Sequence, residues 1–385
     1  MLKSLVDNGH REVKVSNIRA STERGCHRVA ADVDGVPLWY ESDEIELLPA
    51  PEAFGTALLL PALQRGRRLT LDAPVSAKWL SNVGRLLDVW REWWDYPPLL
   101  PRAATHLEMD AARRAEFDET TAKLETALCF SGGVDSFYSL LHGDDRPRLL
   151  VAAHGFDIPL RDTARMDAFK KSLRAVAASV GAKPVVIRTN FREHPAAGRS
   201  SLWERAHGGA LAALGHLLSG KAGRLIISST YNKSNPQPWG SSFMTDHFWS
   251  SGRMEVAHRG AEMPREEKVR LLAREPLARE HLRVCWENSA PHGNCSRCAK
   301  CVVTMVMLAE WGALDDFPVF DGGDALAERV DALPYLKVYF NRLEKILRRG
   351  RLEPELAGAV RRLVRRSRRV EPFLNCAERL RRAFA

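Results

Sequence analysis

The amino-acid sequence predicts an α/β protein: a parallel-sheet domain, preceded by a small β-rich domain and followed by a basic helical extension. Three observations lead to this prediction. Short apolar runs alternate with helical stretches between residues 126 and 229, apolar and polar residues alternate near the N-terminus, and arginines recur at helical spacing near the C-terminus. Alternating strands and helices are typical of a parallel sheet that helices cover on both faces.

Composition excludes several classes of protein. The chain has 385 residues, of which 45% are hydrophobic and 27% charged, values typical of globular proteins. At about 150 residues per domain, this length allows two or three domains. No segment approaches the roughly 18 consecutive apolar residues of a membrane span, and residues 1–8 lack the apolar core of a secretory signal. We therefore expect a cytoplasmic protein that does not contact a membrane.

Residues 1–100 are predicted to form the β-rich domain, which ends in a helix. Val13–Val15 alternates apolar and polar residues, as a half-buried strand does. Asp34-Gly35, directly before the strand-like Val36–Tyr40, is a strong signal for a hairpin turn. Val75–Trp94 carries apolar residues at helical spacing, so a helix is expected there.

Residues 101–320 are predicted to form the parallel-sheet domain, and residues 321–385 the helical extension. Four apolar runs, each of four to six residues, have the length of buried strands. The strands are expected over Ala127–Phe130, Leu149–Ala153, Pro184–Arg188 and Arg224–Ser229, and the helices over Phe137–His142, Arg165–Val180 and Leu202–Leu218.

A glycine loop follows the first of these strands and opens the first helix. It runs Ser131-Gly132-Gly133-Val134-Asp135-Ser136. Two glycines let the backbone turn tightly and present NH groups to phosphate oxygens, and the helix directs its positive end to the same place. Ser131 and Ser136 add hydroxyl donors. Asp135 would repel bare phosphate, so we expect it to engage a Mg²⁺ ion that bridges phosphate oxygens.

Seven cysteines occur, and an odd number without an export signal argues against a disulfide framework. Four of them fall within 17 positions, namely Cys285, Cys295, Cys298 and Cys301. Four thiolates satisfy a tetrahedral Zn²⁺ ion and leave no open position, so a structural zinc site is predicted. An iron–sulfur cluster, which also takes four cysteines, remains an alternative, as do four reduced cysteines without a metal.

Positive charge is concentrated at the C-terminal end. Residues 341–385 hold 14 Lys and Arg against 5 Glu, a net charge of +9 that equals the net charge of the whole chain. Leu356–Val370 places apolar residues on one stripe and paired arginines opposite, which predicts an amphipathic helix with a solvated face. The alternative is that this basic segment binds RNA or a protein partner.

The loop Ser131–Ser136 resembles the SGGxDS loop of the PP-loop superfamily, also called N-type ATP pyrophosphatases, at all five defining positions. The resemblance implies that the loop residues Ser131, Gly132, Gly133, Val134, Asp135 and Ser136 bind ATP. Members of this superfamily cleave ATP between the α and β phosphates and transfer AMP to a substrate oxygen, and a nucleophile then displaces the AMP.

The cysteine spacing after the loop narrows this resemblance. A PP-loop followed by C-x9-C-x2-C-x2-C is similar to the 7-cyano-7-deazaguanine synthase branch, the QueC-like proteins. These use ATP and ammonia to convert a deazaguanine carboxylate into an amide and then a nitrile, and carry a four-cysteine zinc site. His154, after the second strand, and Arg265 to Lys268 also match this branch. Here, however, about 120 residues precede the loop and over 70 follow the zinc site, so a different carboxylate or base-like substrate is equally expected.

Arg265 and Lys268 are candidate catalytic residues beside Asp135. Either cation would neutralise the pyrophosphate leaving group or bind the substrate carboxylate. The alternative is that this segment is simply the start of a helix, where a proline followed by acidic residues is common. His154 is a candidate ATP contact, since ligands of open α/β sheets collect where strands end.

The predicted function is that of an ATP-dependent adenylating enzyme. It would activate a small-molecule carboxylate, and ammonia or an amine would then displace AMP, with ATP, Mg²⁺ and Zn²⁺ as cofactors. Two alternatives stand beside it: a PP-loop enzyme that modifies tRNA, and a non-catalytic ATP-binding subunit of a larger assembly. A homodimer is a further expectation.

Overall fold

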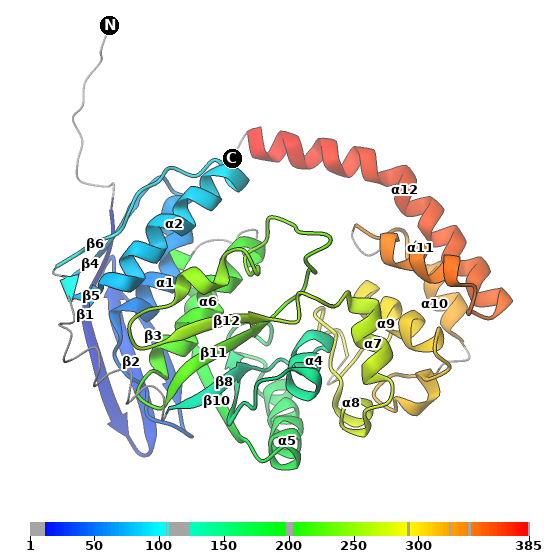
Figure 1. Ribbon diagram of the computed structural model, residues 1–385, viewed down its shortest axis with the longest axis horizontal. Coiled ribbons are helices and arrows are strands. Elements are labelled where there is room, and N and C mark those ends of the chain that lie inside the picture. The colour runs from blue at the N-terminus through cyan, green and yellow to red at the C-terminus, as the bar shows by residue number, and fades with distance from the viewer. Residues whose placement is uncertain are drawn as a thin grey trace, which may run out of the picture. The chain divides into compact units, whose positions relative to one another are not determined.

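The computed structural model describes residues 12–104, 106–107, 124–197, 203–290, 293–322, 325–337 and 340–383, and for 106–107 and 374–383 the backbone alone (Figure 1). Residues 1–8, on which the prediction about export depends, lie outside these ranges. Within the described ranges no helix combines the length and apolar character needed to cross a bilayer.

The first compact unit, made of the chain up to residue 131 and residues 139–263, is built on a ten-stranded sheet (Figure 1). Its strand order is β12-β11-β8-β9-β10-β3-β2-β1-β4-β6. Neighbours from β12 to β10 pair in parallel, the pairs β10-β3, β3-β2 and β2-β1 are antiparallel, and β4 and β6 continue in parallel. A mostly parallel sheet with helices confirms the α/β fold class.

The expected strands and helices of the parallel half are present. Leu128, Val151 and Ile187, on three of these strands, are almost fully buried, which explains why the strands appear in the sequence as continuous apolar runs. The strands are β8 (Glu125–Cys129), β9 (Leu149–His154), β10 (Lys183–Thr189), β11 (Ala222–Ser228) and β12 (Glu255–Arg259), and the helices are α5 (Thr163–Ser179) and α6 (Trp203–Leu217), with short helices η1 (Phe191–Glu193), η2 (Pro195–Ala197) and η4 (Asp246–Trp249).

The N-terminal strands contain the predicted hairpin. Val33 pairs with Val36, so Asp34 and Gly35 alone form the turn, with φ of +50° and +81°. Positive φ at both central residues is the type I′ geometry that matches the twist of the flanking strands. The strands of this segment are β1 (Glu12–Glu23), β2 (Cys26–Val33), β3 (Val36–Ser42) and β4 (Arg68–Leu71), followed by the two-residue strands β5 (Val75–Ser76), β6 (Arg102–Ala103) and β7 (His106–Leu107).

Two helices of the N-terminal segment fill the core. Helix α1 (Pro51–Leu63) is buried on nearly every side and packs against α6, where Gly209 permits the approach because a Cβ there would lie 2.5 Å from the Thr56 carbonyl oxygen. Helix α2 (Ala77–Trp94), predicted from its spacing, begins where the Ser76 side chain accepts a hydrogen bond from the Trp79 NH. The predicted helix is therefore confirmed, while α1 was not predicted.

The second compact unit consists of Gly132–Tyr138 and the chain from Pro264 onward. It is helical, and α10 and α11 both pack against α12 (Figure 1). Its helices are α4 (Val134–His142), α7 (Arg265–Leu272), α8 (Pro276–His281), α9 (Ala299–Ala309), η5 (Leu314–Asp316), α10 (Leu326–Ala332), α11 (Phe340–Arg349) and α12 (Pro354–Ala383), of which α4 runs on into the first unit.

These two units do not follow the three predicted ranges 1–100, 101–320 and 321–385. Strand β3 from the first range pairs with β10 from the second, through Glu41 with Arg188 and Tyr40 with Thr189. Strands β1 to β4 therefore extend the central sheet, whereas β5 pairs with β7 in a separate two-stranded sheet. The division into a β-rich domain, a parallel-sheet domain and a helical extension at these boundaries stays a prediction.

Candidate functional site

The glycine loop lies between β8 and α4, in the predicted order of strand, loop and helix. Gly132 adopts a φ of +73°, a conformation that residues with a side chain rarely take. Its carbonyl oxygen accepts a hydrogen bond from the Arg283 NH at 2.8 Å. The Gly133 carbonyl oxygen accepts from the Phe137 NH at 3.0 Å and from Ser136 Oγ at 3.0 Å, so the loop closes into the first turn of α4.

Asp135, in the first turn of α4, contacts both cations that the sequence singled out. Arg265 Nη1 donates to its Oδ2 at 2.5 Å, and Lys268 Nζ donates to its Oδ1 at 3.1 Å. Both cations come from the first turn of α7, three positions apart, so they lie on one face of that helix. The structure thus brings the three predicted catalytic residues together within the second unit.

The two cations keep the Asp135 carboxyl ionised. Burial raises its pKa, but the charges of Arg265 and Lys268 outweigh this effect and lower the pKa to about 2. Lys268 is itself only 1% exposed, and its Nζ lies 5.3 Å from the centre of the Tyr138 ring. Buried charges of this kind are stable only when paired, so any ligand that draws Asp135 away must supply replacement negative charge.

A second set of ion pairs holds α7 against α11. Lys345 contacts Glu266 at 3.2 Å, and Arg349 contacts both Glu267 at 2.5 Å and Glu310 at 3.2 Å. The side chains of Glu266 and Glu310 are almost completely buried. These pairs fix the helix from which Arg265 and Lys268 project.

The four clustered cysteines form a site that fits a metal ion. Their sulfur atoms all lie within 4.8 Å of one another, and all four residues are buried. The Sγ atoms of Cys295 and Cys301 are 3.9 Å apart, close to the roughly 3.8 Å that tetrahedral coordination at about 2.3 Å requires. A hydrogen bond from Cys301 lowers the pKa of Cys298 below that of a free thiol, which favours its thiolate form.

The backbone around the cysteines is arranged as a turn that presents sulfur to a metal. The Cys298 NH donates to Cys295 Sγ at 3.2 Å, and the Cys301 NH donates to Cys298 Sγ at 3.5 Å. Asn294 joins the two halves of the site: its Oδ1 accepts from the NH groups of Val284 and Cys285, and its Nδ2 donates to the Leu282 carbonyl oxygen at 2.8 Å. This network holds the ligands in place, as second-layer hydrogen bonds do in metal sites.

His154, the remaining predicted ATP contact, belongs to the first compact unit. It ends β9, is 4% exposed, and its Nε2 lies 3.0 Å from the Pro159 carbonyl oxygen. Burial lowers its pKa. This hydrogen bond holds the residues after β9, and contact of His154 with ATP stays a prediction.

The structure also reveals polar residues that the sequence reasoning missed. Asp246 is fully buried in the first unit and accepts hydrogen bonds from Ser241 Oγ at 2.6 Å and His258 Nδ1 at 2.7 Å. The Asn294 bridge was missed as well, although its place directly before Cys295 was a usable signal. No sequence motif marks Asp246 and His258, because these two side chains come together only when η4 packs against β12.

Comparison of this chain with protein-family models, curated proteins and solved structures finds no match. The assignment of its function therefore depends on the chemistry of its own residues.

Proposed function

We propose that this protein is an ATP-dependent adenylating enzyme of the PP-loop type, which activates a carboxylate substrate with release of pyrophosphate. One observation carries the proposal. At a glycine loop that opens a helix, a partly buried and ionised carboxylate lies between a buried arginine and a buried lysine, namely Asp135, Arg265 and Lys268. A loop that only turned the chain would not need to hold three charges, two of them buried.

The loop and the cations suit a triphosphate. Backbone NH groups of a loop that opens a helix are suited to bind phosphate oxygens. Ser136 Oγ, which donates to the Gly133 carbonyl oxygen at 3.0 Å, would turn to a phosphate oxygen when the nucleotide binds. Arg265 and Lys268 would neutralise the charge that develops on the leaving pyrophosphate, and such preorganised charge carries much of the catalysis in phosphoryl transfer. Their pairing with Asp135 keeps both cations in place before the nucleotide arrives.

Asp135 is the residue that would hold Mg²⁺, because it is ionised at every physiological pH and its oxygen atoms are hard ligands. When bound, the ion supplies further neutralisation of the phosphate oxygens. Asp135 would then exchange its two cationic partners for the metal, while Arg265 and Lys268 turn to phosphate.

The proposed reaction has two balanced steps. A carboxylate oxygen of the substrate attacks the α-phosphorus, the bond between the α-phosphorus and the α–β bridging oxygen breaks, and pyrophosphate leaves. Ammonia then attacks the carbonyl carbon of the acyl adenylate, the bond to AMP breaks and a proton is released. The products are an amide, AMP and pyrophosphate. In the QueC-like case, the substrate would be a deazaguanine carboxylate.

The four-cysteine site would hold a Zn²⁺ ion with a structural role. Four thiolates fill a tetrahedral coordination sphere, so no position is left for a substrate or water. The ion would tie the chain at Cys285 to the start of α9. The Asn294 side chain adds hydrogen bonds to the carbonyl oxygens of Leu282, before Cys285, and of Val319.

Product analysis tests the proposal. The full-length protein is incubated with Mg²⁺, ATP, ammonium and a panel of carboxylates that includes 7-carboxy-7-deazaguanine, and AMP, ADP and pyrophosphate are quantified. We expect AMP and pyrophosphate in equal amounts with one carboxylate, lost in Asp135→Ala and retained in Asp315→Ala, which removes an exposed aspartate of the same unit.

Two outcomes would overturn the proposal. Formation of ADP and phosphate would show cleavage at the wrong bond. ATP binding without any product, across the whole panel, would favour the non-catalytic ATP-binding subunit or an RNA substrate.

A further inference from the structure

Six arginines occur between residues 361 and 369 of α12, and the structure separates them into two groups of three. Three are engaged in ion pairs or carbonyl contacts with the neighbouring helices, and three have no partner among the described residues. The engaged arginines are Arg362, Arg366 and Arg368; the others are Arg361, Arg365 and Arg369.

The three engaged arginines attach α12 to the helices beside it. Arg362 Nε donates to Asp331 of α10 at 3.0 Å, and Arg366 Nη2 donates to the carbonyl oxygen of Leu333 at 2.9 Å, just after that helix ends. Arg368 pairs with Glu344 of α11. These contacts attach α12 to its two neighbours, and they account for half of the arginines.

The other three arginines form a single row, here called the free arginine row. Arg361, Arg365 and Arg369 are exposed and four positions apart, so each lies about 6 Å further along the same helix face. The opposite face is buried through Val360 and Leu363. No carboxylate of the described chain neutralises the row, and like charges at this spacing repel one another. The row therefore costs stability rather than adding to it.

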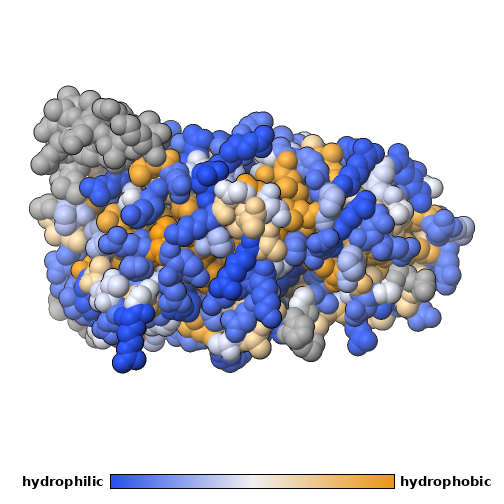
Figure 2. All heavy atoms as spheres, turned by 90° about the horizontal axis from the view of Figure 1, so that it is seen from below, coloured by the Kyte–Doolittle hydropathy of each residue, from blue (hydrophilic) through white to orange (hydrophobic). Residues whose placement is uncertain are grey.

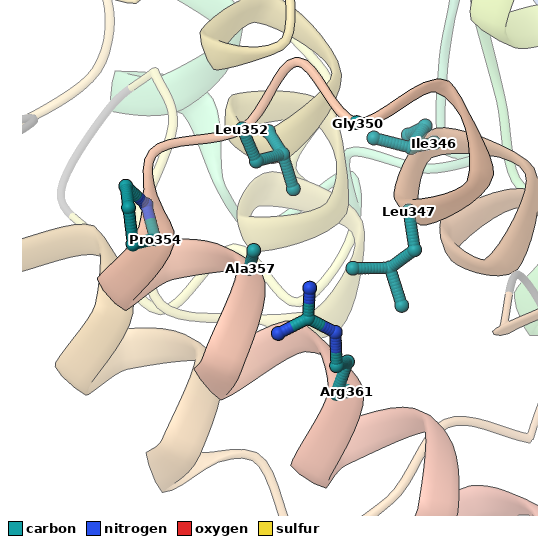
Figure 3. Close-up of a pocket in the computed structure, with 7 residues that line it drawn as sticks. All are labelled: Ile346, Leu347, Gly350, Leu352, Pro354, Ala357 and Arg361. Carbon is teal, nitrogen blue, oxygen red and sulfur yellow. The ribbon is translucent and has the colours of Figure 1, made fainter.

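A small cavity opens at one end of this row. Arg361 lines it together with residues of α11, the connecting turn and the start of α12 (Figure 3). Its volume is about 240 Å³, and Arg361 is the one charged residue among the seven that line it. The remaining lining residues are Ile346, Leu347, Gly350, Leu352, Pro354 and Ala357.

We propose that the free arginine row binds the phosphate backbone of a single-stranded nucleic acid, with one unpaired base in the cavity beside Arg361. Guanidinium groups bind phosphate through two parallel hydrogen bonds and also stack on planar bases. The three arginines are spaced about one helical turn apart, so they can contact successive phosphates of a nucleic-acid strand. The cavity has room for a base, and a base inside a duplex could not enter it.

The surface of α12 disfavours a membrane as the partner. Helices that lie on membranes place large apolar residues beside their cations. Among residues 354–373 of α12, whose side chains the structure describes, Phe373 is the one exposed large hydrophobic residue. Figure 2 shows another face of the molecule, on which hydrophilic residues surround several hydrophobic areas. The proposal does not depend on the adenylation reaction, since it uses none of the loop residues.

Fluorescence anisotropy with the full-length protein tests the proposal. The probes are a labelled single-stranded RNA of about 12 nucleotides, the DNA of the same sequence and the matching duplex. We expect salt-sensitive binding of the single strands that exceeds binding of the duplex. In Arg361→Gln/Arg365→Gln/Arg369→Gln, the slope of log K against log salt should fall by about 2, as expected for three lost phosphate contacts on a single strand.

The matched control removes the same charge from the engaged arginines, as Arg362→Gln/Arg366→Gln/Arg368→Gln. It should keep most of the affinity and lose thermal stability instead. Equal loss of affinity in both triple variants would overturn the proposal, because net charge alone would then explain binding. So would equal binding of vesicles rich in anionic lipid or of polyglutamate, or no binding of any nucleic acid.

The cavity has its own test. Ala357→Leu fills it without changing charge, and should weaken binding of the single strands while leaving the salt slope as in the wild type. Unchanged affinity of the single strands in this variant, with thermal stability retained, would overturn the base-binding part of the proposal.

Discussion

Arg265 Nη1 lies 2.5 Å from Asp135 Oδ2, although 130 positions separate the two residues along the chain. Lys268 completes the contact from the same helix. The pair joins the glycine loop to α7, and the lowered pKa of Asp135 is its electrostatic consequence. A loop with a fixed carboxylate and two fixed cations is prepared for a charged ligand, and the following predictions test that interpretation.

Lys268→Ala should lower kcat/KM for AMP formation by about 100-fold or more, since a buried cation that stabilises transition-state charge is lost. Steady-state kinetics measures the loss, and zinc content should stay at the wild-type level. Lys337→Ala, which removes an exposed lysine of the same unit, is the control and should be fully active. Near-normal turnover of Lys268→Ala would remove Lys268 from the mechanism.

The Asp135 carboxylate should contribute pH-dependent stability. Its pKa is lowered from 3.8 to about 2 on folding, so the contribution is complete above pH 4 and is lost as the pH falls through 2. About 1 kcal/mol of it should be gone at pH 3.

Urea unfolding of the wild type and Asp135→Asn at several pH values measures this contribution. The difference in unfolding free energy between them should shrink from pH 6 to pH 3, and comparing the two proteins cancels any change caused by the cysteine site. A difference that stays constant over this range would mean that the carboxyl is not held ionised by Arg265 and Lys268.

The cysteine site should bind one zinc ion per chain. Cys298→Ser should lose the metal, and Asn294→Ala should weaken its binding by about 10–100-fold, because the second-layer hydrogen bonds to the ligand backbone disappear. Cys26→Ser, a cysteine outside the cluster, is the control and should retain zinc. Metal analysis by mass spectrometry decides the matter; iron together with visible absorption would instead identify an iron–sulfur cluster.

Arg349 should couple α7 to α9 through its contacts with Glu267 and Glu310. Burial raises the pKa of Glu310, while Arg349 acts against that rise. Arg349→Gln should therefore cost about 2 kcal/mol of stability, since a buried carboxylate loses its cation. In a double-mutant cycle with Glu310→Gln, we expect a coupling energy of about 1 kcal/mol. Strictly additive effects of the two substitutions would contradict this coupling.

The sequence predicted those elements whose signals are local. The hairpin at Asp34-Gly35 could be predicted because its turn needs positive φ at two consecutive residues, and aspartate followed by glycine is one of the few pairs that adopt this geometry readily. The spacing of Val83, Leu87 and Trp90 revealed α2, since only one face of that helix is buried. The four strands β8–β11 were found within about two residues at each end, because buried parallel strands appear as short apolar runs.

Elements that depend on distant contacts were not predictable. Helix α1 is apolar all round, so it shows no periodicity from which a helix could be recognised. The antiparallel pairing of β3 with β10 joins residues about 150 positions apart and carries no sequence signal. In the candidate site, Arg265 and Lys268 were named from their charge, but their contact with Asp135 follows only from the fold.

The transfer of oxygen from substrate to AMP tests the central claim most directly. The carboxylate that supports product formation is labelled with ¹⁸O, and the nucleotide products are analysed by mass spectrometry in the wild type and in Asp135→Ala. Adenylation of the carboxylate predicts AMP that carries one ¹⁸O atom, formed by the wild type and not by the variant. Unlabelled AMP, or ¹⁸O in inorganic phosphate accompanied by ADP, would contradict the account.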